Sequence, residues 1–197
     1  MPLEERNPRS SRRGGSQLRV LGASEEALHR LESAWAVNPS AGVLAAELIR
    51  EYGKRGEVQQ SETVLDTFAA EGPQGVLPHL RNVLANVLMD AGKEEKARQL
   101  LRKNSSLLFD QDAIDAAILA RRLRDPRAAH RHFQRAGDAI DAAPRALLEF
   151  VQTKLQLAKE ARWARRDDSR RQFLREARTL LERLLQLSAS PTRHAWA

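Results

Sequence analysis

Apolar residues recur along this chain at intervals of three and four positions. The pattern is clearest over residues 83–88 and 177–185. This spacing places apolar side chains on one face of an α-helix, and no segment alternates strictly between apolar and polar residues as a half-buried strand does. The pattern therefore predicts an all-α chain.

Helix-breaking residues interrupt the pattern at regular intervals. The interruptions are Asn38-Pro39, Gly53 to Gly56, Gly72-Pro73, Gly92, Asp125-Pro126, Pro144 and Pro191. Helices of about 12 to 15 residues, the length these breaks allow, are marginally stable in isolation. Each predicted helix must therefore bury one face against its neighbours. The residues expected in this core are Leu48, Tyr52, Leu65, Leu84, Leu101 and Phe133.

The segments between the breaks share a period. Pro39 and Pro73 are 34 residues apart, and Ala27 and Ser61 are also 34 residues apart. In each segment a small residue is followed four positions later by a larger apolar one. These pairs are Ala27 and Leu31, Ser61 and Leu65, Ala97 and Leu101, and Ala129 and Phe133.

The period varies slightly from one segment to the next. Gly56 and Gly92 are 36 residues apart, which indicates a two-residue insertion within residues 71–78. Ala97 and Ala129 are 32 residues apart. The sequence thus indicates degenerate copies of one structural unit.

This combination of period, small and large residue pair and closing proline resembles the tetratricopeptide repeat. The resemblance covers about Ser24 to Ala197, in four to five degenerate units. It implies a right-handed superhelical solenoid of antiparallel helix pairs, with Gly56 and Gly92 in the turns inside two of the units. A generic helical bundle is the alternative.

Three units depart from the family pattern. The first has a second helix, over residues 25–37, but no convincing first helix. The fourth has Arg124-Asp125-Pro126 where the turn glycine is expected. In the fifth, Ala129 and Ala177 are 48 residues apart, 14 more than the 34-residue step, which should lengthen both helices and their connection.

The predicted domain organisation has two parts. Residues 1–22, rich in Arg, Ser, Gly and Pro, form a flexible basic tail, and residues 23–197 form the repeat domain. Trp196 falls where the family places a large aromatic residue in a first helix, so we expect the domain to be incomplete at its C-terminus. A missing continuation would expose the leucines of residues 180–185 and favour self-association through that end.

Composition narrows the possible functions. The 197 residues carry a formal net charge of +7, which favours acidic partners. The absence of cysteine excludes disulfides, thiol catalysis and cysteine-based zinc sites. No apolar run approaches the roughly 18 residues of a membrane helix, and no secretory signal is recognisable, so the cytoplasm is the expected location.

No residue pattern points to an enzyme, a metal site or a cofactor. His130 and His132 are two positions apart, so on a helix they point about 200° apart and do not chelate one ion readily. The acidic cluster Asp110, Asp112 and Asp115 lacks the glycine and terminal glutamate of a calcium loop. Neither a glycine-rich phosphate loop nor a nucleophile elbow is present.

The resemblance implies that first helices line a concave groove that binds an extended peptide or a partner's helix. Arginine and asparagine side chains can bond a peptide backbone or carboxylate. The groove candidates are Arg50, Lys54, His79, Asn82, Asn86, Arg121 and Arg122. The alternative is that these residues are merely exposed polar side chains. The chaperone-tail clamp of some family members is not present.

Two other functions remain open. The basic stretch Arg162 to Arg178 includes Trp163 and Phe173 and would suit nucleic acid. It would equally suit a solvated helix face, with nearby carboxylates offsetting the charge and Phe173 in the core. The chain could also be a regulatory or assembly region of a larger enzyme or secretion-machinery protein.

Overall fold

A computed structural model describes residues 25–104, 108 and 110–189. Every regular element in these ranges is a helix, which confirms the prediction of an all-α chain. The predicted basic tail over residues 1–22 lies outside the described residues, as do Pro191 and Trp196.

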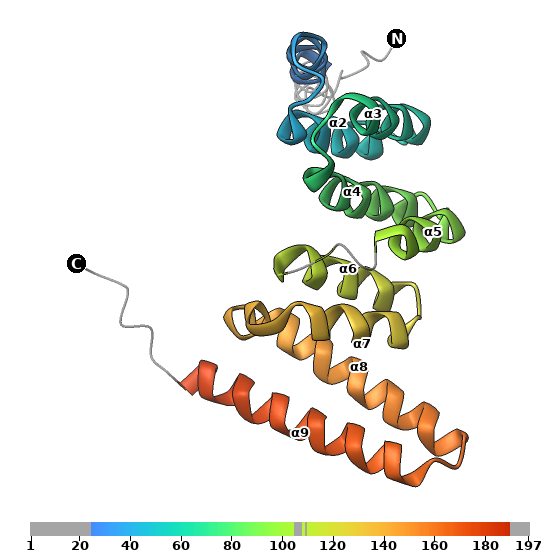
Figure 1. The fold of residues 1–197 in the computed structure, drawn as a ribbon, viewed down its shortest axis with the longest axis vertical. Helices are drawn as coiled ribbons and strands as arrows, with labels where there is room; N and C mark the ends of the chain where they lie inside the picture. The colour runs from blue at the N-terminus through green and yellow to red at the C-terminus, as the bar shows by residue number, and fades with distance from the viewer. Residues whose placement is uncertain (1–24, 105–107, 109, 190–197) are drawn as a thin grey trace, which may run out of the picture. The chain divides into compact units, whose positions relative to one another are not determined.

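The helices begin and end close to the helix-breaking residues of the sequence, in the order drawn in Figure 1. The first covers residues 25–37. It is followed by α2 (Gly42–Lys54), α3 (Val58–Glu71), α4 (Leu77–Asp90), α5 (Glu94–Asn104), α6 (Asp110–Arg122), α7 (Pro126–Arg135), α8 (Pro144–Trp163) and α9 (Asp167–Ala189). Two short 3-10 helices, η1 (Gln74–Val76) and η2 (Gly137–Ala142), lie before α4 and α8.

The chain divides into two compact units at Gln74 and Gly75. The sequence had predicted a single repeat domain over residues 23–197. The first unit contains α2, α3 and the helix that precedes them, and the second contains α4 to α9.

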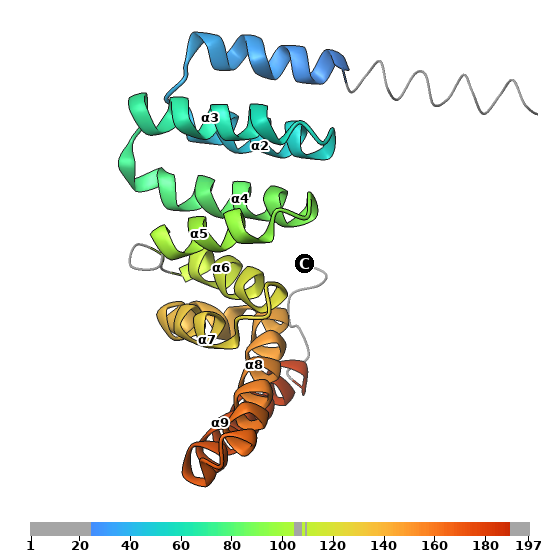
Figure 2. The same cartoon turned by 90° about the vertical axis from the view of Figure 1, so that its right-hand side faces the viewer.

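Within each unit, consecutive helices pack as pairs: α2 with α3, α4 with α5, α6 with α7, and α8 with α9 (Figure 2). Each pair is joined by a short turn, so its helices run antiparallel. Ser61, Ala97 and Ala129 are fully buried on the second helices, and Ala177 is 2% exposed. Small side chains at these positions let the paired backbones approach closely. The larger residues predicted for the core are buried as well: Leu48, Leu65, Leu84, Leu101 and Phe133.

Two predictions about the first unit need correction. Ala27 is exposed, because the covered face of its helix carries Leu28, Leu31 and Trp35 instead. The Trp35 ring stacks on Phe68, with centroids 6.4 Å apart. Tyr52 is only half-buried, because its hydroxyl reaches out to donate a hydrogen bond to Glu32 (2.8 Å).

The four turns inside the pairs have the same backbone geometry. Each contains one residue in the left-handed region: Gly56 (φ 76°), Gly92 (φ 73°), Arg124 (φ 57°) and Arg165 (φ 54°). The N–H of the next residue donates to the carbonyl five residues earlier. These bonds join Glu57 to Tyr52, Lys93 to Leu88, Asp125 to Ala120 and Arg166 to Ala161, at 2.7–2.9 Å. This is the 6→1 bond of a Schellman motif, so the sequence repeat is also a repeat of backbone structure.

The last pair is longer than the others, as its sequence spacing predicted. Helix α8 has 20 residues and α9 has 23, compared with 13 and 14 in α2 and α3. The expectation of a longer connection is wrong, because the turn at Arg165 matches the others. The 14 extra residues are divided between the helices, and about seven in each add two turns of 3.6 residues. Two whole turns keep the buried face in register.

Candidate functional site

Three predicted groove residues on α4 contact α6. His79 Nδ1 lies 2.8 Å from Asp112 Oδ1, and the Asn82 amide donates to the Asp112 carbonyl oxygen at 2.9 Å. The Asn86 amide donates to the Asn82 carbonyl oxygen at 3.1 Å. These side chains therefore join two successive first helices of the second unit.

The two predicted arginines of α6 continue this network. Arg122 donates to Asn86 Oδ1 at 3.2 Å and pairs with Asp90 at 2.7 Å. Arg121 pairs with Glu149 of α8. We call the resulting set the polar row: His79, Asn82, Asn86, Asp90, Asp112, Arg121, Arg122 and Glu149. It contains five of the seven predicted groove residues.

Exposure decides which parts of the polar row a partner could reach. Asn82 is 3% exposed and its amide is used inside the protein, so it supports the helices rather than a ligand. The side chains of Asp90 and Arg122 are 69% and 44% exposed. The accessible surface of the row therefore presents a carboxylate beside a guanidinium, and not positive charge alone.

The remaining two predicted residues lie on α2 in the first unit. Arg50 pairs with Glu47 and Lys54 pairs with Glu51, each three residues earlier in the same helix. All four basic residues among the groove candidates therefore have a carboxylate partner in the chain. Pairing at exposed positions contributes little stability and does not prevent an exchange of partners.

The basic stretch near the C-terminus is centred on the turn between α8 and α9. Trp163, at the end of α8, is 79% exposed, and Arg162, Arg165 and Arg166 beside it are also exposed. We call these four residues the basic turn. None of them has an ion pair or ring partner among the described residues. Further along α9, Arg171 pairs with Asp168 and Arg178 pairs with Glu182, so the solvated-face interpretation fits that part better.

A buried lysine, which no sequence pattern indicated, connects α7, α8 and α9. The Lys154 side chain is 5% exposed and pairs with Glu176 of α9. Its Nζ lies 3.5 Å from His130 Nε2, and 4.9 Å and 5.6 Å from the ring centroids of Phe150 and Phe173. Phe173 is half-buried in this cluster.

The Lys154 cluster shifts the titration of its neighbours. Burial, followed by the charge of Lys154, lowers the pKa of His130. Burial opposes the ionisation of Glu176, but hydrogen bonds from Lys154 and Gln172 outweigh it and lower the pKa of this carboxyl. The cluster is therefore a Lys154–Glu176 ion pair beside a neutral histidine, which can fix α9 on α8.

The described residues hold no group of three or more His, Cys, Asp or Glu side chains that could bind a metal ion. None of the described helices is long and apolar enough to cross a membrane. Comparisons with protein-family models, curated proteins and solved structures find no match. Function must therefore be inferred from the surfaces themselves.

Proposed function

We propose that this chain is a non-enzymatic scaffold of the tetratricopeptide type, whose helix pairs stack in a right-handed superhelix. Its partner is a peptide or helix of another protein, bound along the polar row. The observation that carries the proposal is the polar row itself. Hydrogen bonds and ion pairs link polar side chains of three successive first helices, α4, α6 and α8, and the turns inside the four pairs share one backbone hydrogen bond.

The polar row suits a peptide for a physical reason. Its side chains are held by bonds between helices, so little conformational entropy is lost when a partner binds. Arg122 is the most accessible cation of the row, and its guanidinium can exchange the Asp90 carboxylate for a carboxylate of the partner. Asn86 next to it can bond a peptide backbone.

The test begins with selection of acidic peptides from a random library on the whole chain. Selected peptides are then titrated against the Arg122→Glu variant. We expect binding to weaken tenfold or more, because the substitution places a second carboxylate beside Asp90. The matched control is Arg145→Glu, an exposed residue of α8 with no partner among the described residues. Equal affinity for the wild type and Arg122→Glu, or equal losses in both variants, would contradict the site.

The basic turn favours a second candidate function, the binding of single-stranded nucleic acid. A tryptophan that is 79% exposed among unpaired arginines offers a stacking surface next to positive charge. Titration with labelled single-stranded RNA should show affinity that falls steeply with salt. Trp163→Ala should then cost about 1–3 kcal/mol of binding free energy. Salt-independent binding, or no effect of Trp163→Ala, excludes this candidate.

A further inference from the structure

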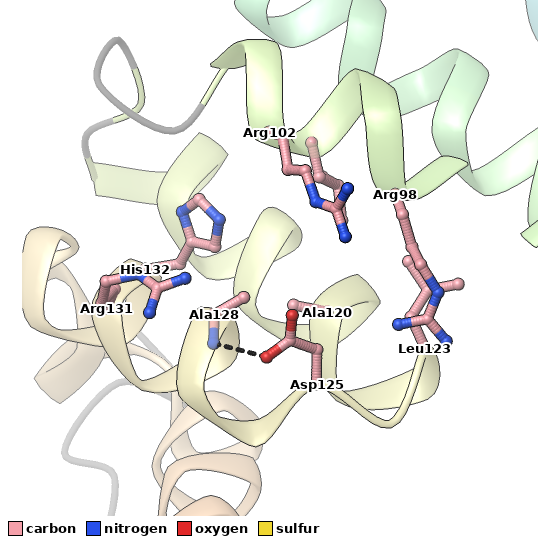
Figure 3. Close-up of a pocket in the computed structure, with 9 residues that line it drawn as sticks. Arg98, Arg102, Ala120, Leu123, Asp125, Ala128, Arg131 and His132 are labelled. Carbon is pink, nitrogen blue, oxygen red and sulfur yellow. Dashed lines mark hydrogen bonds between the residues drawn. The ribbon is translucent and has the colours of Figure 1, made fainter. Parts of the chain in front are cut away.

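A cavity of about 110 Å³ lies between α5, the end of α6 and the start of α7. Figure 3 shows Arg98 and Arg102 extending into it from α5, while Asp125, Arg131 and His132 approach from the opposite side. The rest of its wall is mainly apolar. The cavity is separate from the polar row and from the basic turn.

The cavity contains an excess of positive charge. Arg98 faces Glu94 of its own helix at 3.6 Å. The side chains of Arg102 and Arg131 make no hydrogen bond or ion pair with any described residue. The only carboxylate in the wall belongs to Asp125, and it accepts the Ala128 N–H at 2.9 Å as the N-cap of α7. Arg98 is thus balanced by Glu94, and two unpaired guanidinium groups, those of Arg102 and Arg131, remain beside one carboxylate that already accepts a hydrogen bond.

His132 adds a buried polar group to the same wall. The residue is 3% exposed, and its Nδ1 is buried without a hydrogen-bond partner among the described residues. Burial, followed by the charges of Arg135 and Arg131, lowers the pKa of His132 to about 4. The imidazole is therefore neutral at pH 7. Buried polar atoms nearly always have a partner, so His132 Nδ1 is a hydrogen-bonding group that is available to a ligand beside two unpaired arginines.

We propose that this cavity binds a phosphate group, with Arg102 and Arg131 contacting its oxygens and His132 supporting one side. Guanidinium groups match the geometry of phosphate oxygens and bind them bidentately. The cavity volume is that of several water molecules, which is enough for one phosphate group but not for a large ligand. Phosphate has more oxygens than a carboxylate, so it can accept hydrogen bonds from both guanidinium groups at once.

The phosphate group can come from two sources, the free ion or a phosphomonoester. Calorimetric titrations of the whole chain with inorganic phosphate and with O-phosphoserine, at constant ionic strength, distinguish them. Binding of both indicates a cavity open to phosphomonoesters, and binding of inorganic phosphate alone indicates a site for the free ion. Acetate is the carboxylate control, and acetate binding as tight as phosphate binding would overturn the phosphate assignment.

Matched variants locate the bound ion. Arg102→Gln and Arg131→Gln should each weaken phosphate binding about tenfold, while Arg145→Gln, an exposed change of equal charge, should leave it unchanged. Bound phosphate should also raise the pKa of His132 in an NMR titration, because a nearby anion stabilises the imidazolium. No phosphate binding by the folded wild type, or equal weakening in all three variants, would overturn the proposal.

Discussion

Arg124 and Arg165 occupy turn positions where the first two turns have glycine. An L-residue in the left-handed region costs about 1–2 kcal/mol, and glycine avoids most of this cost. The two arginines are therefore local sources of strain that the surrounding helix pairs tolerate. They also explain why these turns are harder to recognise in the sequence than those at Gly56 and Gly92.

Arg124→Gly should consequently raise the free energy of unfolding by about 1 kcal/mol, because Arg124 has φ 57°. The reverse control is Gly92→Ala, which should lower stability by a similar amount. A Cβ at Gly92 would meet no atom within 4 Å, so the loss would come from the backbone alone. Urea unfolding midpoints measure both. A destabilised Arg124→Gly variant would show that the arginine side chain has a stabilising role.

The lowered pKa of His132 predicts how the free energy of unfolding depends on pH. Its pKa is about 4 in the folded chain, below the ordinary value of 6.5, so the unfolded chain binds the proton more readily. The contribution of the neutral His132 imidazole to the free energy of unfolding is fully present above pH 6.5, and it is lost as the pH falls towards 4. The slope approaches about 1.4 kcal/mol per pH unit for one such group.

Urea unfolding between pH 7 and about pH 4 measures this slope, which should be shallower in His132→Gln. The control is His29→Gln, because the side chain of His29 is 81% exposed and its replacement should change the slope little. Unchanged slopes in the His132→Gln variant would show that other groups cause the acid sensitivity. His130, whose pKa is also lowered, is the first group to consider in that case.

At the scale of the helix, α8 carries a lysine where the apolar period calls for a core residue. Lys154 lies four residues after Phe150 and four before Ala158, both buried. The sequence alone shows this only as an irregularity. Its meaning depends on Glu176 and His130, which lie on the two neighbouring helices, so the cluster could not be predicted from the pattern of α8.

Removal of the Glu176 charge should lower the free energy of unfolding more than replacement of Lys154 by an apolar residue does. Glu176→Gln leaves the Lys154 ammonium buried without its counter-charge and should cost about 2–3 kcal/mol, reduced by the partial exposure of Glu176. Lys154→Met should cost less, because methionine fills the same space among the phenylalanine rings. Thermal unfolding of the two variants compares them. A larger loss for Lys154→Met would mean that the ion pair itself stabilises the contact between α8 and α9.

The pairing of helices was largely predictable from the sequence, and the reason lies in the small residues. Ser61, Ala97 and Ala129 mark the positions where the paired helices approach closely. Small residues recur at this spacing because larger side chains would overpack the helix crossing. The division of the fifth unit's extra residues was not predictable. Without a glycine at Arg165, the sequence does not show where α8 ends and α9 begins.

At the scale of the whole molecule, the sequence identified five members of the polar row but not their bonds. Arg122 and Asp90 are 32 residues apart, and their contact depends on how closely α4 and α6 approach. The resemblance to a repeat family predicted which side chains lie on the first helices, and the structure shows which residues those side chains contact. The phosphate cavity had no sequence signal, because its arginines come from α5 and α7.

Helix α9 leaves several leucines uncovered. Leu174, Leu181, Leu185 and Leu187 are 40–65% exposed, and an apolar strip of this kind favours association. The expected exposure of Leu180 is wrong, because this leucine lies in the core and is 7% exposed. Sedimentation velocity should show an average mass that rises with protein concentration. The double variant Leu181→Glu with Leu185→Glu should remain monomeric, whereas Thr179→Glu, an exposed change on the same helix, should behave as the wild type. A monomeric wild type at all concentrations would contradict this expectation.

The most direct test of the proposed function is hydrogen exchange of the whole chain with and without a selected acidic peptide. We expect the peptide to slow exchange in α4 and α6, around Asn86 and Arg122, and Arg122→Glu to abolish this protection. Protection confined to the basic turn, around Trp163 and Arg165, would contradict binding along the polar row.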